Sequence, residues 1–133
     1  MAAYNKFLPA VDVMQEGMNA ATDVWKIVLA TALANTDTTI TAEVANGNGY
    51  TTGGKTAATT SATTTAGVFK LILASPAAWT ATGAGFTFRY AILYNSTTST
   101  PVGYWDYGSS QAVAAGETVT VTLDAVNGVY TVQ

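Results

Sequence analysis

The sequence predicts an all-β fold, a β-sandwich of the jelly-roll or immunoglobulin-like kind with a short N-terminal arm and helix. Two observations support this. Apolar residues make up 49% of the 133 residues and charged residues only 10%, so threonine carries much of the polarity. Threonine is β-branched and favours extended backbone. Short runs of alternating or apolar side chains are separated by turn residues, with no alternation of strands and helices.

Three segments have the pattern of well-buried strands. They are residues 24–31 (VWKIVLAT), 68–75 (VFKLILAS) and 86–95 (FTFRYAILYN). Each carries apolar side chains on both of its faces. Such strands lie in the middle of a sheet that is covered on both sides, or are partly buried by a partner.

The end of the chain predicts a hairpin. In residues 117–124 (ETVTVTLD) three apolar side chains alternate with three threonines, which places one face inward and the other in solvent. The dipeptide Asn127–Gly128 follows, and it tolerates the positive φ angles of a tight turn. We therefore expect residues 117–124 to pair with residues 128–133.

The chain divides into residues 1–22, an arm with a short helix, and residues 23–133, a single β-sandwich domain. Apolar side chains at positions 7, 11, 14 and 18 follow one helical face and predict a helix over about residues 9–17. Two roles are open for this segment. It covers one end of the core, or it is an arm that reaches a neighbouring subunit. On the second view, deleting residues 2–8 leaves the domain folded.

The polar tract over residues 35–67 contains two unusual stretches. Residues 45–55 form a glycine-rich loop, and Gly49, Gly54, Lys55 and Thr56 match the spacing of a phosphate-binding loop. That mechanism needs a buried strand before the loop and a helix after it. The threonine-rich residues 56–67 are a poor helix, so we expect a chance match. They predict an edge strand with small side chains, or a segment that partly lacks structure.

The composition argues against several classes of function. The chain has no cysteine and no histidine, and its acidic residues are scattered. We therefore expect no enzyme, no metal and no cofactor. The net charge is −3 without a basic stripe, which argues against nucleic acid as a partner. No apolar run is long enough to cross a membrane, and the N-terminus lacks the pattern of a signal peptide, which indicates synthesis in the cytoplasm.

The most conspicuous stretch is PVGYWDYGSS, residues 101–110. In a strand, Tyr104 and Asp106 point to one face, and Trp105 and Tyr107 to the other. We expect Asp106 to pair with Arg89, with a lysine or with backbone amides rather than to act in catalysis. One of the two faces packs on the core, and the other lies on the surface or in a subunit contact.

Five residues are the candidates for a subunit interface, chosen for their size and apolar character: Tyr4, Phe7, Leu8, Trp105 and Tyr107. Stacking on sugars is the competing use of surface aromatics. A carbohydrate-binding module would use Trp105 with Tyr107, or Tyr50 with Trp79.

Several short motifs occur in a fixed order: YNKF, GNGYTTGG, FRYAILYN, GYWDYGSS and GETVTVTLD. In this the chain resembles a family of small structural proteins of tailed bacteriophages, of the head decoration (cement) type. The resemblance covers almost the whole chain. It implies a protein of the virion, on the capsid surface, that bridges adjacent shell subunits. Its partners would be the major capsid protein and copies of itself, as a dimer or trimer. A phage tail protein (tube, terminator or fibre-associated) is the alternative.

Overall fold

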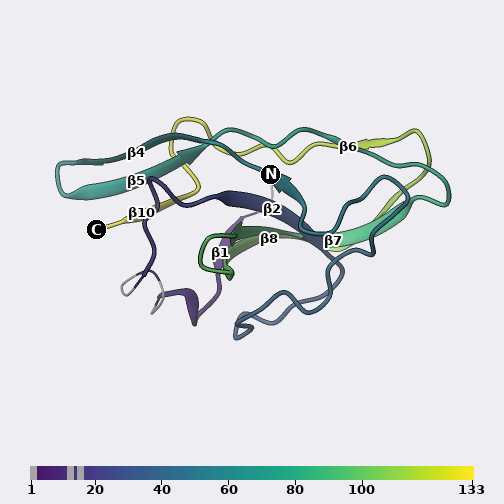
Figure 1. Cartoon of the computed structure of the whole chain (residues 1–133), viewed down its shortest axis with the longest axis horizontal. Coiled ribbons are helices and arrows are strands. Elements are labelled where there is room, and N and C mark those ends of the chain that lie inside the picture. The colour runs from purple at the N-terminus through teal and green to yellow at the C-terminus, as the bar shows by residue number, and fades with distance from the viewer. Residues whose placement is uncertain (1–2, 12–13, 15–16) are drawn as a thin grey trace.

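The computed structural model describes residues 3–11, 14 and 17–133, and nearly all the regular secondary structure in this part of the chain is β-strand. Figure 1 shows its strands. They are β1 (Tyr4–Lys6), β2 (Trp25–Ala30), β3 (Lys55–Thr56), β4 (Thr59–Thr65), β5 (Val68–Leu73), β6 (Trp79–Thr80), β7 (Phe86–Asn95), β8 (Thr100–Val113), β9 (Thr118–Val119) and β10 (Tyr130–Val132). The all-β prediction is confirmed.

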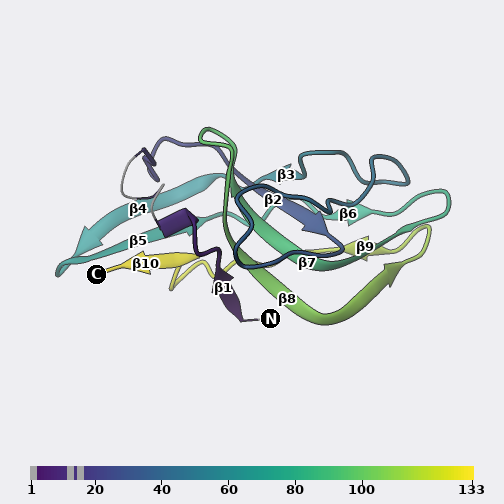
Figure 2. The same cartoon turned by 90° about the horizontal axis from the view of Figure 1, so that it is seen from below.

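These strands form three antiparallel sheets. The largest has the order β1-β8-β7-β2-β3, the second β10-β5-β4, and the third pairs β6 with β9. The two smaller sheets lie beside each other over one face of the five-stranded sheet (Figures 1 and 2). A single cluster of buried apolar side chains joins the three sheets.

The two central strands of the large sheet are buried on both faces, as their sequences predict. β7 lies between β2 and β8. On one face Ile27 and Leu93 are fully buried, and on the other Val28 and Ile92 are only 1% exposed. Burial on both faces explains why these segments lack a clean apolar–polar alternation.

The predicted C-terminal hairpin is wrong. β9 pairs with β6 and β10 pairs with β5, so residues 117–124 and 128–133 are not partners. The alternation itself is right, because Val121 and Leu123 are buried although they lie outside any strand. The Asn127–Gly128 turn exists, but the Asp124 carboxylate holds it by accepting bonds from the amides of Val126 and Asn127. That turn redirects the chain to a different sheet.

The threonine-rich tract is ordered as an edge strand. β4 pairs with β5 on one side only, and a two-residue turn at Ala66 and Gly67 joins them. Both turn residues have positive φ, 53° and 79°, which is the type I′ geometry that fits a twisted hairpin. The hairpin projects at one end of the molecule (Figures 1 and 2).

The N-terminal segment lies against its own chain. β1 pairs with β8, and Phe7 and Ala10 are each 1% exposed. Ala10, Val11 and Met14 are helical, and the remainder of the helix predicted over residues 9–17 falls partly on residues 12–13 and 15–16, outside the described residues. Met14 and Met18 pack partly against the core, so this segment covers one edge of it. Val11, on the predicted apolar stripe, is instead 44% exposed.

Candidate functional site

The stretch 101–110 lies within β8, where its side chains differ in burial. Trp105 is 5% exposed and belongs to the core, whereas Asp106 points to the surface beside Arg89. Tyr104 and Tyr107 are half-buried. Each packs edge-on against a phenylalanine, Tyr104 on Phe7 and Tyr107 on Phe88. Both tyrosines are therefore engaged in contacts within the chain.

Asp106 forms an ion pair with Arg89, which is one of the structural partners expected for it from the sequence. Arg89 donates to both carboxylate oxygens, from Nε at 2.8 Å and from Nη2 at 2.9 Å, and the Gly108 amide donates at 2.8 Å. The Arg89 hydrogen bonds, with the Gly108 amide, lower the pKa of Asp106, and the same pairing raises the pKa of Arg89. A carboxylate held ionised by three donors has little capacity to take up a proton, so the geometry fits a structural role.

The residues that match a phosphate-binding loop have other tasks. A Cβ on Gly49 would lie 2.1 Å from the carbonyl oxygen of Thr80, and one on Gly54 would lie 2.0 Å from that of Ile27. These glycines therefore permit close packing of backbone on backbone. Lys55 Nζ donates to the carbonyl of Ala78, and β3 follows the loop where a helix would be needed. The loop therefore lacks the helix that phosphate binding by this motif requires.

Tyr50 and Glu43 form a hydrogen-bonded anchor beneath this loop that was not predicted from the sequence. The Tyr50 hydroxyl accepts a bond from the Leu29 amide and donates to the Glu43 carboxylate, which also accepts from the Gly53 amide. Tyr50 is 2% exposed, and burial, with the bond to Glu43, raises its pKa far above the usual range. A lone tyrosine in a glycine-rich loop was the available signal.

Burial removes most of the ring faces on which a carbohydrate-binding module depends. Tyr50 and Trp79 stack on each other with ring centroids 6.4 Å apart, and Trp79 is only 1% exposed. Trp105 is also buried. Of the four aromatic residues considered for sugar stacking, only Tyr107 remains half-exposed.

The five interface candidates separate into two groups. Tyr4, Phe7 and Trp105 pack within the chain: the Tyr4 ring meets Trp105 at 5.4 Å and lies where a side chain on Gly103 would stand. Burial raises the pKa of Tyr4. Tyr107 is half-buried, and Leu8 is 51% exposed. Of these five candidates, only Leu8 is exposed enough in the single chain to contact another molecule without rearrangement.

The burial of Phe7 also changes the expectation for the arm. Phe7 is 1% exposed, and its amide donates to the Val102 carbonyl at 3.0 Å. Deleting residues 2–8 would remove β1 and open the core beneath Phe7. The expectation that this deletion leaves the domain unharmed is therefore not supported by the packing.

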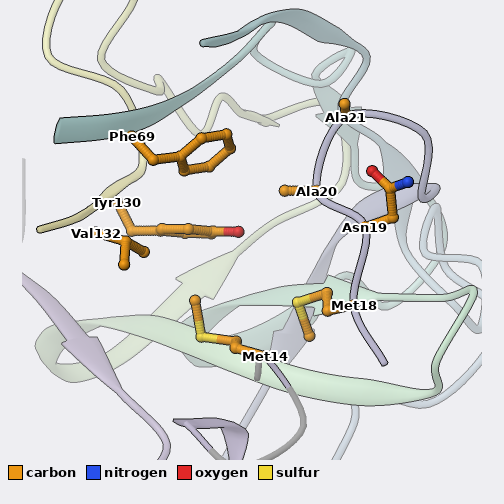
Figure 3. A pocket seen from close by; sticks show the side chains of 8 residues that line it. All are labelled: Met14, Met18, Asn19, Ala20, Ala21, Phe69, Tyr130 and Val132. Carbon is orange, nitrogen blue, oxygen red and sulfur yellow. The ribbon is translucent and has the colours of Figure 1, made fainter. Parts of the chain in front are cut away.

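A groove lies between the N-terminal segment and the inner face of the β10-β5-β4 sheet. Two adjoining cavities of about 390 and 310 Å³ share Met14, Tyr130 and Val132 as lining residues. Figure 3 shows Phe69, Tyr130 and Val132 on one side, with Met14 and Met18 opposite them. We call this feature the terminal groove.

The terminal groove is mainly apolar and has exposed apolar side chains at its margin. Val11 and Val132, which line it, are 44% and 40% exposed. Burial, with the nearby charge of Asp23, raises the pKa of Tyr130 to about 12, so its hydroxyl stays neutral at ordinary pH. The arrangement suits contact with another apolar surface rather than acid–base chemistry.

Over residues 3–11, 14 and 17–133, no three histidine, cysteine or acidic side chains come together in a way that could hold a metal ion. In the same part of the chain, no helix has the length and apolar character needed to cross a membrane.

Comparison with known protein families, with curated proteins and with solved structures finds no match. Functional inference for this chain therefore depends on its own residues and geometry.

Proposed function

We propose that this protein is a structural component of a tailed-phage virion, a decoration (cement) protein that binds the outer capsid shell and stabilises contacts between its subunits. The proposed role is mechanical and includes no catalytic step. The proposed fold is a β-sandwich of jelly-roll or immunoglobulin-like type, with the five-stranded sheet as one layer. The proposed partners are the major capsid protein and further copies of this chain.

The observation that carries the proposal is the terminal groove with its exposed margin. Val11 and Val132 are each at least 40% exposed, although they line an apolar cavity. Exposed apolar side chains that gather at a hollow are typical of protein contact sites. The motif order that resembles phage structural proteins supports the same reading. Contacts of modest strength suffice on a virion, because they repeat over a symmetric shell.

The rest of the molecule supplies rigidity rather than chemistry. The central strands bury both faces, and the carboxylate of Asp106, the most conspicuous in the sequence, is bonded to Arg89. In this mechanism the sandwich is a stiff spacer, and the groove end attaches it to the shell. Added interface area of this kind opposes separation of neighbouring shell subunits.

Binding to shells that lack the protein tests this attachment. The double variant Val11→Ser/Val132→Ser removes two exposed apolar side chains that line the groove, and we expect shell binding to weaken roughly tenfold or more. Val126→Ser is the matched control, because Val126 is 74% exposed and lies outside the lining of the groove. Equal binding by the double variant and the unmodified chain would contradict the proposal.

A further inference from the structure

β4 is an edge strand without the usual protection. It is the outermost strand of its sheet, and no described strand pairs with its open side. From Thr56 to Phe69 the sequence contains no charged residue and no proline. Natural edge strands generally carry a lysine, a proline or a central bulge that blocks further pairing. The one irregularity in β4 lies at its start, between Thr59 and Ser61, and the pairing from Ser61 to Thr65 is regular.

The hairpin geometry fixes which backbone groups face the open side. The two-residue turn closes on the pair Thr65–Val68, and the pairs toward the other end are Thr63–Lys70 and Ala62–Leu71. In an antiparallel hairpin of this kind, hydrogen-bonded pairs alternate with pairs that do not bond to each other. Thr65 and Thr63 therefore bond to β5. The backbone groups of Ala62 and Thr64 point away from it.

The sequence of β4 reads nearly the same in both directions about Ala62. Residues 59–65 are TTSATTT, so a two-fold axis at Ala62 places Thr60 opposite Thr64 and Ser61 opposite Thr63. The outward groups agree with this axis, since Ala62 would exchange two hydrogen bonds with its own copy. Cross-strand hydroxyl pairs are favourable, and the smallest side chain lies at the axis.

We propose that β4 is a dimerisation edge, to which a second copy of this chain adds its own β4 in antiparallel register centred on Ala62. The second copy is the occupant that the observations favour, because an isologous contact requires a self-complementary segment and a neutral one avoids like-charge repulsion. The pairing joins two three-stranded sheets into one continuous sheet. The hairpin projects at the end of the molecule, which leaves its edge accessible (Figure 2). This inference does not depend on a virion role.

Two charge variants of the full-length chain test the register. Ser61 and Thr63 have their side chains on the outer face, and the proposed axis places each opposite the other in the partner. Ser61→Glu/Thr63→Glu places like charges opposite each other twice. Ser61→Lys/Thr63→Glu places opposite charges there instead, at the same two positions. By sedimentation over a range of concentrations, we expect a dimer for the unmodified chain, at least a tenfold weaker dimer for the first variant, and recovery in the second.

A second measurement guards against misfolding of a variant. In the unmodified chain, hydrogen exchange of the Ala62 and Thr64 amides should slow as the protein concentration rises, because only the dimer pairs them. A monomer at every concentration, a trimer, loss of the dimer in both charge variants, or exchange of these amides that ignores concentration would each overturn the proposal. A monomer that gains mass only with shell subunits would assign the β4 edge to another partner.

Discussion

The centre of the five-stranded sheet and the β4–β5–β10 end of the molecule differ in how completely they bury their apolar surface. Around β2 and β7, side chains on both faces of the sheet are excluded from water, and Ile27, Leu29 and Leu93 are fully buried. At the β4–β5–β10 end, Phe69 and Tyr130 are only half-buried and face a groove. The first region contributes most to stability, and the second leaves apolar surface exposed at the place where we propose that a partner binds. Both regions are rich in apolar residues, and they differ in the exposed fraction of those side chains.

The largest expected effect is a loss of stability when a side chain is removed from the well-buried central strands. Leu93→Ala removes a fully buried side chain from β7, and we expect the free energy of unfolding to fall by about 2–5 kcal/mol. Phe69→Ala, at the groove, should cost no more than about 1–2 kcal/mol, because part of the ring already contacts water. Urea denaturation of both variants measures the difference. Equal losses would mean that the groove end is as tightly packed as the centre.

A pair of glycine substitutions gives an intermediate effect. Gly54 and Gly67 both have positive φ, 69° and 79°, so alanine is strained at either position. At Gly54 the new Cβ would also meet the Ile27 carbonyl oxygen, whereas at Gly67, at the tip of the hairpin, nothing lies within 4 Å. We expect Gly67→Ala to cost about 1 kcal/mol and Gly54→Ala distinctly more. Thermal melts compare the two variants directly, and a larger loss at Gly67 would contradict the packing described for the loop.

The smallest expected effect is a change with pH in the stability that Asp106 contributes. The pKa of Asp106 is lowered in the folded protein by Arg89, so its stabilising contribution is full above the ordinary aspartate pKa and is lost as the pH falls toward the lowered value. The melting temperature of Asp106→Asn should therefore lie slightly below that of the unmodified chain at neutral pH and approach it in acid. Arg89→Gln is the control, because in that background Asp106→Asn should show little pH dependence. A difference in melting temperature that grows as the pH falls would contradict the stabilising role assigned to ionised Asp106.

The sequence predicted the central strands better than the connections between them. Residues 86–95 were assigned correctly because a run apolar on both faces has few alternatives to a buried strand. The pairing of residues 117–133 failed because the choice of partner for β10 depends on β5, far away in the chain. The packing role of Gly54 could not be predicted from the sequence either, since it depends on the close approach of the Ile27 carbonyl.

The candidate site was predictable in part. A structural partner for Asp106 was expected, but the choice of Arg89 over a lysine depends on how β7 and β8 pair. Of the residues named as interface candidates, Leu8 is exposed, whereas Phe7 and Trp105 are buried within the chain. Size and hydrophobicity favour core and interface alike, and only the tertiary structure separates them. Phe69 and Val132 were not named from the sequence, because they line the groove only through the pairing of β5 with β10.

The copy number of this protein in purified virions tests the central claim most directly. Quantitative mass spectrometry against the major capsid protein gives this ratio. A decoration protein of the shell should be present at a stoichiometry comparable to that of the major capsid protein. A far lower ratio would place the protein in the tail or a fibre, and its absence from virions would contradict the proposed function.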